Sequence, residues 1–131
     1  LDSIHAGGLC GISTPLDPMI TKADDLSGQV MAREGELPPV WEELRIDLVL
    51  LDAMVSSSGE EPEKVRPLQS GEMLMLNSAT ATSVGTVSQI KGKNATIKLR
   101  LPICAEVGSR ITLSRRIGSR WRLIGHASIK E

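Results

Sequence analysis

The side chains best suited to chemistry in this chain are arginines gathered near its end. Arginine donates paired hydrogen bonds to a phosphate group, so such a group can hold an RNA backbone. Arg120 and Arg122 flank one aromatic residue, Trp121, but no series of aromatic residues is interleaved with the arginines to stack bases, which argues against readout of single-stranded sequence. The alternatives are a solubilising rim of the domain, or pairing with Glu106 or with acids of the first half. We predict as RNA-binding residues Arg115, Arg116, Arg120 and Arg122.

Two short patterns suggest a nucleotide site but lack its other parts. Asp25 and Gly28 fit the Asp-x-x-Gly pattern that contacts a γ-phosphate and its Mg²⁺ in GTPases. The glycine-rich phosphate loop that must accompany it is missing, because Gly92-Lys93 lacks the upstream glycine and the following hydroxyl residue. We therefore interpret both patterns as turns, and we predict no catalytic, cofactor or metal site in this chain.

Histidine and cysteine do not form a site by spacing either. His5 and His126 are far apart, and we interpret each as a solvated or hydrogen-bonded imidazole. Cys10 and Cys104 show no zinc-type spacing, and one disulfide between them is the alternative to the state that we expect, two reduced, buried thiols in a cytosolic protein. No apolar run approaches the roughly 20 residues of a membrane helix, and no signal peptide is visible.

Charge is divided unevenly along the 131 residues. Residues 1–65 carry 13 acidic and 4 basic side chains, whereas residues 66–131 carry 3 acidic and 11 basic ones. Either strands of the two halves interleave and the charges mix, or the domain has an acidic and a basic surface. Residues 60–63, Glu-Glu-Pro-Glu, are interpreted as a solvated loop, with docking of a basic partner as the alternative.

The elements that must position these side chains are strands. From Glu72 to Lys130, apolar and polar residues alternate with period two, which is typical of strands with one buried face. Turns are predicted at Gly92-Lys93-Asn94 and Gly118-Ser119, and a bulge at Gly85. In the first half we expect a short strand within residues 1–20, strands over 24–33 and 44–50, and a loop over 34–39. About seven short strands favour an antiparallel barrel or sandwich.

Several stretches resemble one family in particular. The stretches Gly71–Asn77, Leu101–Gly108, Ile111–Arg116 and Ser119–Gly125 closely resemble the C-terminal domain of the gamma subunit of archaeal and eukaryotic translation initiation factor 2. Gly7–Gly11, Leu16–Pro18 and Leu37–Pro39 are similar to that family's passage from its second to its third domain. The Leu101–Cys104 stretch looks more archaeal than eukaryotic. Ser13-Thr14, Met19 and Ser78-Ala79 depart from the usual pattern.

The resemblance implies an all-β fold: an antiparallel β-barrel of the elongation factor Tu C-terminal-domain type. It implies that residues 1–20 are the last strand of a second barrel plus a connector, and that residues 21–131 are the third domain. The GTPase domain, with its GTP and Mg²⁺, would precede Leu1, so that this chain is non-catalytic within a parent GTPase.

With GTP, the parent would carry methionyl initiator tRNA to the small ribosomal subunit together with alpha and beta subunits. The alternative reading from the residues alone is a stand-alone RNA-binding or protein-interaction barrel.

Overall fold

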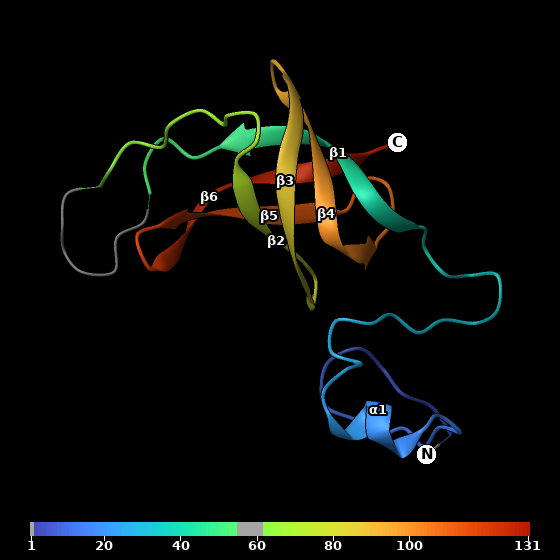
Figure 1. Cartoon of the computed structure of the whole chain (residues 1–131). Helices are drawn as coiled ribbons and strands as arrows, with labels where there is room; N and C mark the ends of the chain where they lie inside the picture. Colours follow the sequence, from blue (N-terminus) through green and yellow to red (C-terminus); the bar gives the residue numbers. More distant parts are fainter. Residues whose placement is uncertain (1, 55–61) are drawn as a thin grey trace.

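Six antiparallel strands dominate the computed structural model, which describes residues 2–54 and 62–131. They are β1 (Val40–Leu50), β2 (Met73–Ser78), β3 (Ala81–Lys91), β4 (Asn94–Cys104), β5 (Arg110–Ile117) and β6 (Arg120–Lys130). The strands close into a barrel in the order β1-β4-β3-β2-β5-β6, and β6 pairs with β1 (Figure 1). This confirms the all-β antiparallel barrel, with six described strands where about seven were expected.

The barrel interior is filled by aliphatic side chains from every strand. Leu44 and Ile46 of β1, Leu74 and Leu76 of β2 and Ile97 of β4 are completely buried. Alternate residues of each strand point inward, so the period-two pattern in the sequence supplies the core. At about 25 cal/mol per Å² of buried apolar area, such a core can stabilise the barrel without phenylalanine or tyrosine.

Gly85 of β3 owes its identity to packing inside the barrel. A Cβ at this position would lie 2.5 Å from Ile97 Cγ2 and 3.0 Å from the Lys98 carbonyl oxygen. The register is regular at Gly85, which pairs with Leu74 and Leu99, and the irregularity lies between Val87 and Gln89. The bulge predicted at Gly85 is therefore wrong, and the glycine marks a close approach of strands.

The turns predicted for the two hairpins are confirmed. The β3–β4 turn holds Gly92 at φ +61°, and the β5–β6 turn holds Gly118 at φ +62°. Both values lie in the left-handed region, which glycine adopts without a steric penalty. These turns set the pairing of the strands that carry most of the basic residues.

The part of the chain before β1 folds differently from the expectation. Pro18–Lys22 forms α1, a five-residue helix whose Asp17 side chain accepts a hydrogen bond from Met19 N at 2.9 Å. Asp24–Arg33 is not a strand: Ser27 N donates to Asp24 O at 2.9 Å and Asp24 has φ 56°, which is turn geometry. No strand of residues 2–54 or 62–131 pairs with this segment, and alternation alone cannot hold a strand without a partner.

Residues 2–17 also contain no strand. Their assignment to a preceding barrel stays a prediction, because a last strand needs neighbours that these residues do not include. The predicted loop over 34–39 is confirmed. The part of the chain around Gly28 approaches the turn between β2 and β3, because a Cβ at Gly28 would lie 3.0 Å from Ala81 Cα.

Candidate nucleic-acid interface

The β5–β6 hairpin places the four predicted arginines in three different environments. Arg116 and Arg120 are exposed, Arg122 is half-buried, and Arg115 is only 7% exposed. In the ladder, Arg115 is directly opposite Arg122, whereas Arg116 is opposite Trp121. The hairpin therefore gathers the four residues but does not present them as one uniform surface.

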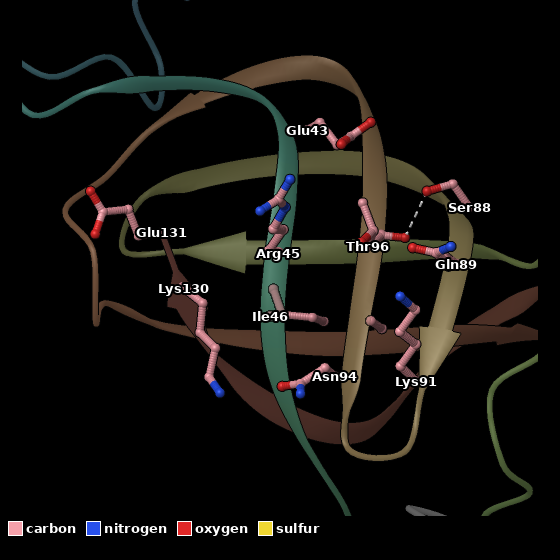
Figure 2. A pocket seen from close by; sticks show the side chains of 11 residues that line it. Glu43, Arg45, Ile46, Ser88, Gln89, Lys91, Asn94, Thr96, Lys130 and Glu131 are labelled. Carbon is pink, nitrogen blue, oxygen red and sulfur yellow. Dashed lines mark hydrogen bonds between the residues drawn. The ribbon is translucent and has the colours of Figure 1, made fainter.

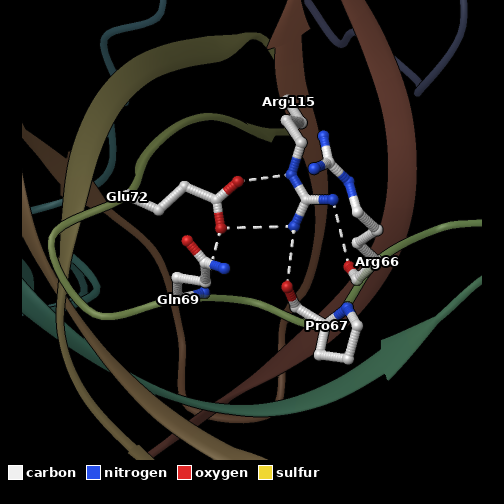
Figure 3. Close-up of polar contacts among 5 residues, drawn as sticks. All are labelled: Arg66, Pro67, Gln69, Glu72 and Arg115. Atoms are coloured by element: carbon white, nitrogen blue, oxygen red, sulfur yellow. Dashed lines mark hydrogen bonds and ion pairs between the residues drawn. The ribbon is translucent and has the colours of Figure 1, made fainter.

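Arg115 is held inside the barrel end by a network that Figure 3 shows in full. Its Nε pairs with Glu72 Oε1, and its Nη2 donates to Glu72 Oε2 at 3.2 Å. The remaining donors reach main-chain oxygens: Nη1 donates to Arg66 O at 3.0 Å and Nη2 to Pro67 O at 3.3 Å. Arg115 thus ties the segment before β2 to strand β5.

Glu72 completes the network from the other side. Its Oε2 also accepts a hydrogen bond from Gln69 N at 3.1 Å. A paired guanidinium and carboxylate with their other donors and acceptors filled is the arrangement that tolerates burial. The ion-pair partner of Arg115 is Glu72, neither Glu106 nor an acid of the first half, and sequence spacing gave no signal for it.

Sequence reasoning also missed Arg66, whose carbonyl oxygen accepts from Arg115. Arg66 lies outside the alternating strands, between Val65 and Leu68, which are both 8% exposed. These buried neighbours anchor the segment, while the Arg66 side chain is exposed. The network therefore adds a third cation, Arg66, near the end of the barrel that carries Arg115 and Arg122.

A second polar feature is a groove of about 660 Å³ that is lined by residues of β1, β3, β4 and the end of β6 (Figure 2). Ser88 Oγ donates to Thr96 O at 3.1 Å within it. Its charged lining mixes both signs: Arg45, Lys91 and Lys130 with Glu43 and Glu131. Such a mixture favours no single class of charged ligand.

The distribution of charge in the barrel matches the interleaving alternative. Acidic β1 lies between β4 and β6, so Glu43 is opposite Lys98. Lys130 Nζ lies 3.9 Å from Asp47 Oδ2 in a second, exposed ion pair. The strand order thus mixes the acidic first half with the basic second half.

The weaker sequence patterns do not come together as a site. Asp25 and Gly28 lie in the turns after α1, and Gly92-Lys93 forms the β3–β4 turn. His126 of β6 is opposite Thr112 of β5, and His5 is exposed in the segment before α1.

No metal centre emerges from the other polar side chains. Both cysteines are free thiols, but the expected burial is wrong: Cys10 is exposed, and Cys104 is half-buried, with its Sγ donating to Pro38 O at 3.3 Å. Within residues 2–54 and 62–131, no three His, Cys, Asp or Glu side chains gather as metal ligands.

Two other expectations concern the surface. Glu60 and Glu61 of the acidic loop lie outside the described residues, while Pro62 and Glu63 are exposed. In the described part of the chain, no helix has the length and apolar character needed to cross a membrane.

Comparison with known proteins gives one consistent result. Residues 42–129 match the family described as "Initiation factor eIF2 gamma, C terminal". The chain is 50% identical over 130 residues to translation initiation factor 2 subunit gamma of Methanocaldococcus jannaschii, covering 99% of this chain and 31% of the relative. It is 46% identical over 131 residues to the same subunit of Thermococcus onnurineus. This match covers 100% of this chain and 32% of the relative.

A third relative extends the range of identity. The corresponding subunit of Methanococcus aeolicus is 52% identical over 126 residues, covering 96% of this chain and 30% of the relative. The chain therefore spans about a third of the length of the curated relatives that it matches.

Proposed function

Because the chain belongs to the translation initiation factor 2 gamma family and matches its C-terminal domain, we propose that it serves as the non-catalytic barrel of such a subunit. In the whole factor, GTP-dependent delivery of methionyl initiator tRNA to the small ribosomal subunit would involve alpha and beta subunits as well. The observation that carries this proposal is the family match over 42–129, which covers all six strands apart from a few terminal residues.

The role of the barrel in this proposal is to hold and orient. A closed sheet with a dense aliphatic core transmits change by moving as a rigid body at its interfaces. The segment before β1 supports packing on other domains, because its apolar side chains line an open hollow of about 560 Å³. Large apolar residues exposed there include Ile12, Leu16, Val30, Met31 and Leu37.

The proposal assigns GTP and Mg²⁺ to a GTPase domain ahead of residues 1–131, not to these residues. Asp25 and Gly28 lie in a turn without a phosphate-binding loop beside them, so they do not fit a nucleotide site. We also propose that residues 1–20 belong to the preceding barrel and its connector, and residues 21–131 to the third domain.

For RNA contact we propose the arginines of the β5–β6 hairpin, with their roles divided. Arg116, Arg120 and Arg122 have side chains exposed or half-exposed to solvent and are free of ion pairs within the described residues. Arg115 belongs to the same group but supports it from inside through Glu72. Phosphate contacts of this kind fix position and do not read sequence.

The test measures binding of initiator tRNA and of small-subunit ribosomal RNA to the full factor across salt concentration. We expect the triple variant Arg116→Gln, Arg120→Gln, Arg122→Gln to bind more weakly, with the slope of log K against log[salt] reduced by about 0.7–0.9 per lost contact. The control variant is Arg100→Gln, an exposed arginine of β4. Unchanged affinity and slope for both RNAs would show that the hairpin does not contact RNA.

A further inference from the structure

Arginines outnumber their acidic partners at the end of the barrel where β5, β6 and the segment before β2 meet. Arg115 and Arg122 are directly opposite each other on adjacent strands, and Arg66 is bonded to Arg115 through its carbonyl oxygen. Of the acids in residues 2–54 and 62–131, only Glu72 forms an ion pair with any of these three. Among the described residues, this cluster of three arginines thus has a single ion-pairing carboxylate.

Such a surplus favours the binding of an anion. Like charges directly opposite on neighbouring strands destabilise a sheet, and partial burial strengthens their repulsion. Arg115 is neutralised by Glu72, and this leaves Arg66 and Arg122 as the cations without a partner among the described residues.

The same network fixes the position of Arg66. Arg115 donates to the carbonyl oxygens of Arg66 and Pro67, at 3.0 and 3.3 Å. Val65 and Leu68 are buried on either side, so the backbone at Arg66 is held at both ends. In Figure 3 the Arg66 side chain extends from its backbone on the side where Arg115 lies.

The chemistry of the cluster selects the ligand. Guanidinium groups bind phosphate with paired, charge-assisted hydrogen bonds. Trp121, the aromatic residue nearest in the chain, alternates with Arg122 along β6 and so projects from the other face of that strand. Arg122 therefore has no aromatic neighbour on its own face of β6, which favours a phosphate group over a base as the ligand.

We propose that Arg66 and Arg122 form a phosphate-binding site at this end of the barrel, with Arg115, paired to Glu72, as the residue that positions them. The phosphate comes from an RNA backbone or from a free anion, and both share this chemistry. Only the assignment to RNA rests on the proposed function; the site itself rests on the charge surplus.

The first experiment titrates the full chain with inorganic phosphate and follows the arginine Nε–H resonances by NMR. We expect the Arg66 and Arg122 signals to shift, and Arg66→Gln or Arg122→Gln to weaken binding about 10-fold, the effect of losing a charge-assisted hydrogen bond. Arg100→Gln, on β4, should change affinity less than 2-fold. Equal affinity in all three variants would overturn the site.

A second variant tests the positioning role of Arg115. Arg115→Lys keeps the charge but lacks the planar fork that reaches Glu72 and the two carbonyl oxygens together. We expect weaker phosphate binding and altered Arg66 signals, while the barrel methyl resonances stay dispersed. Unaltered phosphate affinity in a folded Arg115→Lys protein would contradict the positioning role.

The source of the phosphate is decided with RNA in the same variants. If Arg66→Gln lowers both phosphate affinity and the salt slope of RNA binding, the site takes an RNA backbone. If it lowers phosphate affinity alone, the phosphate site stands and its occupant is a free anion. After that second result, RNA binding by the β5–β6 hairpin would be judged by the triple variant of Arg116, Arg120 and Arg122.

Discussion

Leu123 and Ile124 are adjacent in β6, yet Ile124 is completely buried while 42% of Leu123 is exposed. Neighbouring strand residues face opposite sides, but strict alternation from the buried Gly125 and Ala127 would put Leu123 inside and Ile124 outside, and the ladder explains this reversal. Leu113 is opposite Gly125 but Ser114 is opposite Leu123, so Ile124 is an extra residue in the β6 strand. This bulge reverses the inward and outward faces of the strand at that point.

Ile124→Ala should therefore destabilise the domain much more than Leu123→Ala. Removing a fully buried isoleucine side chain costs about 2–5 kcal/mol, whereas truncation of a half-exposed one costs less than half as much. Urea unfolding of the two variants and the parent measures the free energies directly. Equal losses, or a larger loss at Leu123, would show that β6 has no such bulge.

Gly85→Ala should be strongly destabilising although it adds a single methyl group. That methyl would lie 2.5 Å from Ile97 Cγ2 and 3.0 Å from the Lys98 carbonyl oxygen, and one of the two is backbone. Overpacking of this kind costs about 1–3 kcal/mol. Thr86→Ala, at the next residue on the outer face, is the matched control in thermal unfolding, and a similar midpoint for both variants would contradict the packing argument.

Glu72→Gln should lower the free energy of unfolding, because it leaves the buried Arg115 without its ion-pair partner. Its carboxylate is the ion-pair partner of a guanidinium whose side chain is 8% exposed, so its loss leaves a buried charge unbalanced, at about 3 kcal/mol or more. Asp47→Asn is the control, because the pair of Asp47 and Lys130 is exposed and is worth about 0–1 kcal/mol.

A double variant separates charge from packing at the same place. Glu72→Gln with Arg115→Met removes both charges and should recover part of the stability that Glu72→Gln alone loses. Urea midpoints of the parent, the single variant and the double variant give the comparison. A double variant less stable than Glu72→Gln would mean that the hydrogen bonds to Arg66 and Pro67 outweigh the unbalanced charge.

The chain by itself should not hydrolyse GTP. The turn that holds Asp25 and Gly28 has no phosphate-binding loop beside it, and an acidic residue without one cannot position Mg²⁺ and a γ-phosphate. Release of inorganic phosphate from GTP measures this at high protein concentration. Turnover that Asp25→Asn abolishes would refute the division between this domain and a separate GTPase.

Much of the barrel could be predicted because its strands follow a simple rule. Where one face is buried and the ladder is regular, period two identifies the core, as in Ile97 and Leu99 of β4. The rule failed for Asp24–Arg33, which has suitable alternation but pairs with no strand in the part of the chain that the structure describes. It also failed at Leu123 and Ile124, because a bulge is set by the partner strand.

The sequence identified which arginines belong to the candidate site but not how their side chains are arranged. Clustering along the chain identified the arginines of the β5–β6 hairpin. It could not show that Arg115 points into the barrel, because its partner Glu72 is 43 positions away. Arg66 was missed for the same reason: its place depends on hydrogen bonds from Arg115, and no local pattern encodes those.

Closure of the sheet limits how any other molecule can dock on this domain. Because β1 pairs with both β4 and β6, the six strands leave no open edge along which an added strand could hydrogen-bond. Other domains or molecules must therefore contact side chains, loops or turns. A substitution at the surface can then strengthen or weaken one contact without disturbing the main chain. A domain built this way can keep its shape while its partners change.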